Sequence, residues 1–261
     1  MELHICKNYE ELSDHVAEWM VGYICKTLAT KDRFSIVLTG GNTPKRLYEL
    51  LASDEYNHKI DWSRANVFIG DERFVPFDDE RNNSAMIQKT LLDHVSVRQE
   101  HVHFMQTENM SPETSANAYE EVLHYYFYHQ TSNPVQPDPA RGSERQASNL
   151  STFDLVFLGM GDDAHTLSLF PGQTNAIDEQ NRWCTYLWLE QQNMHRITLT
   201  APVVNAAKCI VFLVSGPGKK EALHNVFNEN HNPAKYPSQI IKPANGQLHW
   251  FVDEDAMGNH L

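Results

Sequence analysis

The sequence repeats one local pattern, in which a short apolar run of strand type ends in a glycine-containing turn and a helix-forming segment follows. The runs are "FSIVL" (34–38), "NVFIG" (66–70), "FDLVFLG" (153–159) and "CIVFLVSG" (209–216). Strands that are apolar throughout, without alternation, are typical of a parallel sheet that is buried on both faces. The pattern therefore predicts an α/β fold: a mostly parallel sheet covered by helices on both faces, in an open, Rossmann-like three-layer architecture.

The flanking segments fit this architecture. Apolar residues recur at every fourth position between residues 9 and 28, which predicts an amphipathic helix there. Further helices are expected near 82–94 and after Pro217, and "QLHWFVD" (247–253) is expected to form one more strand. We expect residues 1–261 to form one domain. Residues 129–150, which are rich in proline and lack aromatic residues, are expected to form an exposed loop insertion.

Composition excludes several classes of partner. The net charge of −13 disfavours binding to nucleic acid or to an anionic membrane surface. The longest apolar runs are far shorter than the roughly 20 residues that cross a bilayer. Four cysteines without CxxC spacing predict reduced thiols, and the first residues do not resemble a signal peptide. We therefore expect a cytoplasmic protein that is a monomer or a weak homo-oligomer.

Ligands of parallel α/β sheets bind where strands end and helices begin, because helix N-termini present unpaired N–H groups there. Four such ends carry unusual residues, namely "TGGNTPKR", "GDER", "GMGDDAHT" and "SGPGKK". The first could hold a phosphate group, although a structural turn is an equally good interpretation, and it is no Walker A motif. Asp71, Glu72 and Arg73 of "GDER" could form a solvated charge cluster or a helix cap instead of a binding site.

His165 is the sharpest candidate for catalysis. A lone histidine is more often a packed or exposed residue, but this one follows glycines at a strand end, and imidazole accepts protons near neutral pH. Asp163 or Asp162 could orient the ring. Arg196 and Lys219 are ordinary surface cations when taken singly, yet around one cleft they could hold an anion. The pair of histidines in "HVH" (101–103) lacks further ligands nearby, so we expect no metal site.

The ordered set of motifs resembles the family of glucosamine-6-phosphate isomerases and 6-phosphogluconolactonases, and within it the lactonases. The matching segments cover nearly the whole chain in family order: "LTGGNTPKRLYELL", "GDERFVPFDDERNNSAMIQKTLLDHV", "FDLVFLGMGDDAHTLSLFPG", "RITLTAPVVNAAKCIVFLVSGPGKKEAL" and "PSQIIKPANGQLHWFVDEDA". The resemblance implies hydrolysis of 6-phosphoglucono-δ-lactone, a small anionic sugar-phosphate lactone of the pentose phosphate pathway. It implies neither a metal nor an organic cofactor.

The resemblance also implies roles for individual residues. By this resemblance His165 would be the general base, and Arg73 would lie in the same site. From their positions in the motifs we also expect Asp163 and Asp71 in the catalytic site. The expected substrate-binding residues are Gly40, Gly41, Asn42, Thr43, Lys45, Arg46, Gly161, Arg196 and Lys219. Two residues depart from the family pattern: Asn42 replaces a serine, and Ala164 replaces a glycine. If position 164 requires a positive φ, alanine is strained there and could lower turnover.

Two other functions compete with lactone hydrolysis. The first is an amino-sugar phosphate deaminase or isomerase on the same fold, in which the base removes a proton from carbon. That family resembles "DEY" and "AFNEP" where this chain has "GDER" and "SLFPG", so the motifs favour the lactonase. The second is a sugar-phosphate binder without catalysis, in which Asn42 and Ala164 would mark a decayed site.

Overall fold

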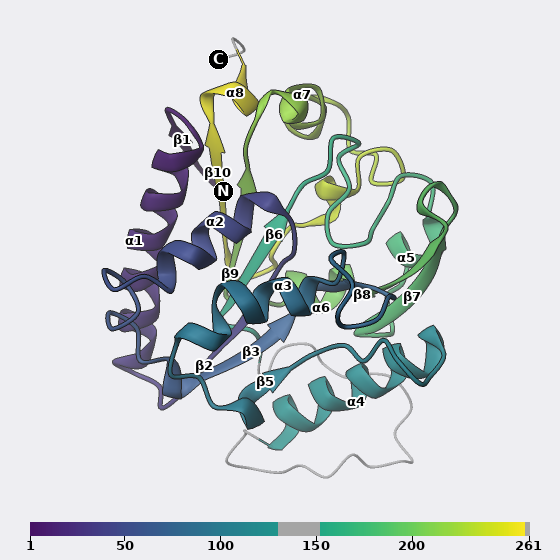
Figure 1. Cartoon of the computed structure of the whole chain (residues 1–261). Coiled ribbons are helices and arrows are strands. Elements are labelled where there is room, and N and C mark those ends of the chain that lie inside the picture. Colours follow the sequence, from purple (N-terminus) through teal and green to yellow (C-terminus); the bar gives the residue numbers. More distant parts are fainter. Residues whose placement is uncertain (130–151, 259–261) are drawn as a thin grey trace.

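The computed structural model describes residues 1–129 and 152–258, and it confirms the predicted α/β fold. In these residues the main sheet has the strand order β1-β10-β9-β6-β2-β3-β5, and each neighbouring pair is parallel (Figure 1). In this order the strands are β1 (Glu2–Cys6), β10 (Gln247–Asp253), β9 (Cys209–Val214), β6 (Leu155–Gly159), β2 (Phe34–Leu38), β3 (Ala65–Ile69) and β5 (Val102–His103).

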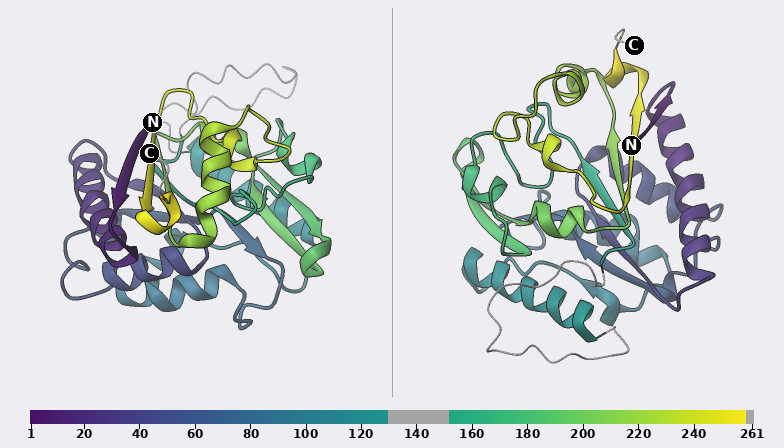
Figure 2. Two further views of the ribbon diagram at one scale, coloured as in Figure 1. Left: turned by 90° about the horizontal axis from the view of Figure 1, so that it is seen from above. Right: turned by 180° about the vertical axis from the view of Figure 1, so that it is seen from behind.

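Helices cover both faces of this sheet (Figure 2). They are α1 (Tyr9–Leu28), α2 (Asn42–Leu51), α3 (Asn83–Thr90), α4 (Pro112–His129), α5 (Thr174–Ile177), α6 (Ala201–Asn205), α7 (Lys220–Asn228) and α8 (Glu254–Met257). Side chains alternate along each strand, so Leu155 and Phe157 of β6 pack toward α1 and α2, whereas Val156 and Leu158 pack toward α4 and α7. Among the described helices, none has both the length and the apolarity needed to cross a lipid bilayer.

A second, antiparallel sheet was not predicted from the sequence. It has the order β4-β8-β7, with β4 (Asp71–Arg73), β8 (Met194–Leu199) and β7 (Cys184–Leu189). The short strand β4 follows β3 after a single glycine, so the chain passes directly from the main sheet into the small one. Asp71 and Arg73 lie on this strand, and its pairing with β8 fixes their orientation.

The predicted element boundaries hold well where the hydrophobic pattern is strong. The bounds of α1, β2 and β10 agree with the predicted ranges. The helix expected over 82–94 is shorter, because the backbone leaves the helical region at Leu91 (φ −132°) and only a 3₁₀ turn follows. Of the loop expected at 129–150, His129 belongs to α4, and the remainder lies outside the described residues.

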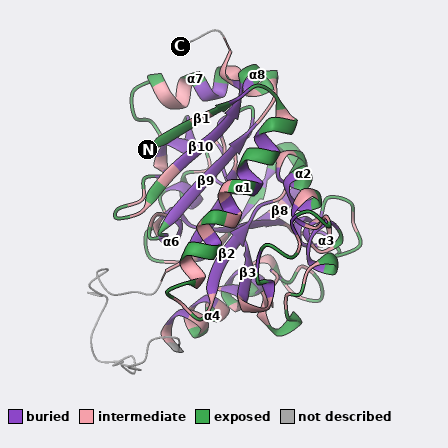
Figure 3. Ribbon diagram, turned by 90° about the vertical axis from the view of Figure 1, so that its left-hand side faces the viewer, coloured by how far each residue is buried: buried purple, intermediate pink, exposed green. Residues whose placement is uncertain are grey.

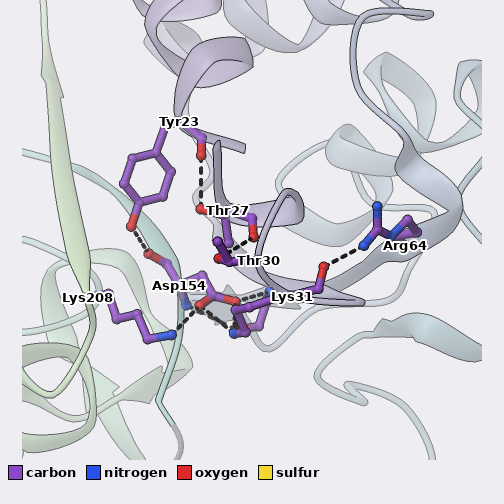
Figure 4. A network of polar contacts seen from close by, with 8 residues as sticks. Tyr23, Thr27, Thr30, Lys31, Arg64, Asp154 and Lys208 are labelled. Atoms are coloured by element: carbon purple, nitrogen blue, oxygen red, sulfur yellow. Dashed lines mark hydrogen bonds and ion pairs between the residues drawn. The ribbon is translucent and has the colours of Figure 1, made fainter. Parts of the chain in front are cut away.

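One buried carboxylate joins three neighbouring strands of the main sheet (Figure 4). Asp154, directly before β6, accepts hydrogen bonds from Nζ of Lys31 at 2.6 Å and from Nζ of Lys208 at 2.9 Å. The backbone N–H of Ser35 on β2 donates to the same carboxylate at 2.9 Å, and the hydroxyl of Tyr23 on α1 donates to the Asp154 carbonyl at 2.8 Å. Because Asp154 is only 1% exposed, these bonds provide the compensation that a buried charge requires.

Candidate active site

The segment after β6 forms a tight loop that holds His165 at the carboxyl end of the sheet. The N–H of Gly161 donates to the His165 carbonyl at 2.8 Å, and the N–H of Ala164 donates to the Gly161 carbonyl at 3.0 Å. A Cβ at position 161 would lie 2.0 Å from Nδ1 of His165, so only glycine fits there. Gly161 is thus required for the backbone to close around the imidazole.

Ala164 adopts a positive φ. The sequence had raised this possibility, because the family pattern has glycine at this position. Its φ is 65°, in the left-handed region, and its side chain is fully buried. The Ala164 carbonyl accepts two hydrogen bonds from Ser238, one from the N–H at 3.0 Å and one from Oγ at 2.8 Å. These bonds hold a conformation that an alanine adopts only at an energetic cost.

His165 and Asp163 form the polar pair expected of a general base and its orienting group. Nδ1 of His165 lies 2.5 Å from Oδ1 of Asp163, and the same oxygen accepts the His165 N–H at 3.1 Å. Since an ionised carboxylate can only accept, Nδ1 is the donor in this bond, and in the neutral ring Nε2 then keeps its lone pair. The ring packs on Phe170 with centroids 4.2 Å apart, and the His165 side chain remains 30% exposed.

The two adjacent aspartates have different partners, which the sequence could not decide. Partial burial opposes ionisation of Asp163, but hydrogen bonds from the ring and N–H of His165 outweigh it and leave the pKa of Asp163 below its ordinary value. Asp162 instead forms an ion pair with Nζ of Lys219, which lies 2.6 Å from its Oδ1. Lys219 ends the 3₁₀ turn Pro217–Lys219 after β9, so this contact brings the β9 loop against the His165 loop.

Asp71 and Glu72 of "GDER" point to opposite faces of β4 and have different partners. Asp71 accepts from Oγ of Ser168 at 2.7 Å and lies 3.8 Å from Nη1 of Arg196. Arg73 faces Arg196 across the antiparallel pair β4–β8. Glu72 between them points to the other face, as successive residues of a strand do. Asp71, Arg73 and Arg196 are therefore collected on one side, next to the loop that carries His165.

Glu72 of β4 binds the first N–H groups of α3, beside the N-cap residue Asn82. Its carboxylate accepts from the N–H groups of Asn83 (2.7 Å) and Ser84 (2.8 Å) and from the Ser84 hydroxyl (2.6 Å). The helix-cap interpretation of "GDER" is thus confirmed for this residue. Burial raises the pKa of Glu72 to about 7, although the hydrogen bonds act in the opposite direction.

Arg73 and Arg196 each have a buried N–H group that is not used in a hydrogen bond among the described residues. Arg196 is 4% exposed, donates from Nη2 to Gln192 at 2.6 Å, and lies with its guanidinium carbon 5.6 Å from the Phe170 ring centre. Burial lowers the pKa of Arg196 to about 10, which leaves it charged at neutral pH. The Nε groups of both Arg73 and Arg196 are buried without a hydrogen-bond partner among the described residues. Such donors are suited to an anionic ligand.

The glycine turn at Gly40 and Gly41, after β2, lies against Asn83, which is bonded to Asp71. A Cβ on Gly40 would come within 1.8 Å of Oδ1 of Asn83, and Nδ2 of Asn83 donates to the Asp71 carbonyl at 2.8 Å. Gly41 has a φ of 107°, and α2 begins at Asn42 without a side-chain cap on its first N–H groups. Gly40 through Thr43 therefore present an open helix N-terminus beside β4.

Lys45 and Arg46 were expected to bind substrate, but they lie apart from the group formed by His165, Asp71, Arg73 and Arg196. Lys45 lies on exposed α2 surface, 4.0 Å from Glu49 in the next turn, and Arg46 is exposed one residue further. The residues that were missed are Ser168, Phe170, Asn83 and Ser238. Ser168 and Phe170 stand inside the histidine motif and could have been found there, whereas Asn83 and Ser238 carry no signal that spacing alone reveals.

The chain is similar to known proteins over most of its length. The family model for glucosamine-6-phosphate isomerases and 6-phosphogluconolactonases matches residues 7–250. The 6-phosphogluconolactonase of Synechocystis sp. is 36% identical over 90% of this chain and 88% of its own, and that of Nostoc sp. is 38% identical over 86% and 83%. The solved 6-phosphogluconolactonase of Trypanosoma cruzi superposes with a TM-score of 0.80 at 25% identity, covering 99% of this chain and 96% of that one. The chain therefore belongs to the glucosamine-6-phosphate isomerase/6-phosphogluconolactonase family.

Proposed function

We propose that this chain hydrolyses 6-phosphoglucono-δ-lactone to 6-phosphogluconate. The observation that carries the proposal is the pair formed by His165 and Asp163, because the carboxylate holds the Nδ1 proton and leaves Nε2 as a base on a partly exposed ring. The lactonase names of relatives that match most of the chain support the choice of reaction.

The reaction needs a base, a positioned ester and stabilisation of an oxyanion. Nε2 of His165 takes a proton from water as the water oxygen attacks the lactone carbonyl. The carbonyl oxygen gains negative charge, which nearby N–H groups and the Arg73 guanidinium stabilise. As the ring C–O bond breaks, the imidazolium returns its proton to the leaving oxygen. The free acid is formed without a covalent intermediate on the protein.

The surrounding cations and N–H groups position the substrate in this proposal. The buried Nε donors of Arg73 and Arg196 and the uncapped start of α2 offer hydrogen bonds to phosphate or sugar oxygens. Lys219 adds a charge that Asp162 partly balances. These groups give an acidic protein a local site for an anion.

The amino-sugar deaminase remains the rival reaction on this fold. The segments "GDER" and "SLFPG" favour the lactonase, since the resemblance gives "DEY" and "AFNEP" for the deaminases. We also propose a cytoplasmic, cofactor-independent protein that is a monomer or a weak homo-oligomer. Its four cysteines form no disulfide, and three of them are buried, which suits a reducing compartment.

The test is a pH-stat assay with freshly prepared δ-lactone, corrected for spontaneous hydrolysis. We expect His165→Asn to lower kcat/KM by about a hundredfold to ten-thousandfold, because it removes the base and keeps a side chain of similar shape. His58→Asn, at an exposed position, is the matched control and should retain wild-type activity. A folded His165→Asn enzyme with unchanged kcat/KM would remove His165 from the mechanism. Release of ammonia from glucosamine 6-phosphate would favour the rival reaction.

A further inference from the structure

Three potential metal ligands gather at the β1 edge of the main sheet. Glu2 and His4 are two residues apart on β1, so their side chains leave the strand on the same face. His249 of β10 is the direct partner of Glu2 in the parallel pairing and lies on that face beside them. Figure 3 shows β1 next to β10, with α1 over this side of the sheet. The cluster joins residues from the two ends of the described chain.

The spacing of the three ligand atoms fits a small divalent ion. Nε2 of His4 lies 3.0 Å from Nδ1 of His249, which lies 3.5 Å from Oε2 of Glu2, and that oxygen is 4.0 Å from Nε2 of His4. In a tetrahedral zinc site with bonds of about 2.0–2.1 Å, ligand atoms are roughly 3.3–3.4 Å apart. The three separations bracket this value, so small side-chain movements would complete one triangular face of the tetrahedron.

The rings are held in place by aromatic neighbours. His4 stacks on Phe251 with centroids 4.2 Å apart and an interplanar angle of 7°, and Trp19 of α1 packs on His249 at 5.0 Å. His249 is buried, while the Glu2 side chain is 62% exposed, so the open side of the cluster faces solvent. The geometry thus offers three protein ligands and a fourth position for water, as in many open zinc sites.

We propose that Glu2, His4 and His249 bind one divalent transition-metal ion, with Zn²⁺ as the best fit. Two imidazoles and a carboxylate suit zinc and its neighbours, whereas Mg²⁺ and Ca²⁺ prefer ligand sets made of oxygen alone. Nε2 of His249 has no hydrogen-bond partner among the described residues, so the usual outer-shell acceptor is missing. We therefore expect a dissociation constant in the micromolar range.

The ion would join the edge strand to its neighbour and would take no part in the proposed reaction. In the sheet order, β10 and β9 separate β1 from β6, the strand that leads to His165. Binding to the folded state alone stabilises that state in proportion to the logarithm of ligand concentration. Zinc should accordingly raise the melting temperature without changing kcat/KM for the lactone.

The experiment is isothermal titration calorimetry of the full chain, without a polyhistidine tag and after removal of metal by a chelator, using ZnCl₂ as the probe. We expect one Zn²⁺ per chain, and we expect His4→Gln and Glu2→Gln each to weaken binding at least about tenfold. Both positions lie on an edge strand and tolerate substitution better than buried His249. His58→Gln, an exposed histidine outside the cluster, is the matched control and should bind like the wild type.

Two outcomes would overturn the proposal. One is wild-type protein that binds no zinc below a concentration of about 100 μM, well above the expected range. The other is a zinc affinity that His4→Gln and His58→Gln leave equally unchanged. Substitution of Co²⁺ for Zn²⁺ gives a second readout, because a tetrahedral site with nitrogen ligands produces visible absorption that His4→Gln should remove. Lactonase activity of the same samples separates this result from the test of His165.

Discussion

Ala164 is a single residue whose backbone strain the sequence already suggested. The departure from glycine raised the question of a positive φ, and the structure gives φ 65° at a fully buried position. Two hydrogen bonds from Ser238 hold the carbonyl of this residue in place. The sequence also predicted that an aspartate orients His165, but it could not choose between Asp162 and Asp163, because that choice depends on the loop dihedrals.

Ala164→Gly should stabilise the protein. Glycine adopts a positive φ without strain, which we expect to raise the free energy of unfolding by about 0.5–1 kcal/mol after the loss of the buried methyl group. Ala222→Gly in α7 is the matched control, also buried, and should lower it by about 1 kcal/mol. Urea denaturation of both variants provides the measurement. An equal loss in the two would show that strain at position 164 is negligible.

At the element scale, the long regular segments were predictable and the short paired ones were not. The range of α1 follows from apolar residues at every fourth position, and β2 and β10 follow from continuous apolar runs. Strand β4 spans only Asp71–Arg73 and is defined by pairing with β8, far along the chain. No local pattern reveals such pairing, so the separate roles of Asp71 and Glu72 became visible only in the fold.

Glu72, which accepts hydrogen bonds from the first N–H groups of α3, should make stability depend on pH. Burial raises its folded-state pKa to about 7 from an ordinary value of 4.5, so between these values the folded state keeps a proton that the unfolded state releases. The contribution is therefore present below the unfolded pKa and is lost as the pH rises through about 7. We expect wild type to lose on the order of 2 kcal/mol between about pH 5 and pH 8 relative to Glu72→Gln.

Urea unfolding of wild type and Glu72→Gln across this pH range measures that difference. Other titrating groups are common to both proteins and cancel in the comparison. A constant destabilisation by the glutamine amide shifts the difference in unfolding free energy equally at every pH. If the unfolding free energy of wild type, relative to that of Glu72→Gln, stays constant or rises with pH, the pKa of Glu72 is not raised.

At the scale of the whole molecule, the parallel sheet is joined by polar contacts as well as by its two apolar layers. Asp154 connects the start of β6 with Ser35 on β2 and with Lys208, just before β9 (Figure 4). This junction lies at the amino end of β6, whereas the His165 loop follows its carboxyl end. The fold class was predictable from the repeated strand and turn pattern. The ion pairs of buried Asp154 were not, because its partners are dispersed along the sequence.

Asp154→Asn should therefore affect stability and leave catalysis unchanged. It leaves two lysines and a buried N–H without their charged acceptor, and we expect the free energy of unfolding to fall by about 2–4 kcal/mol. Lys208→Met, at a half-exposed partner, should lower it by less than about 1 kcal/mol. Urea denaturation beside the lactone assay tests both. A normal unfolding free energy in Asp154→Asn would mean that the cluster contributes little.

The antiparallel pairing of Arg73 with Arg196 limits how this chain can vary in length. Removal of one residue within β8 would turn every following side chain to the opposite face and part the two guanidinium groups. Only insertions or deletions of an even number of residues would keep both side chains on the same face. Tolerated changes in length should consequently collect in the connecting loops and avoid these two strands.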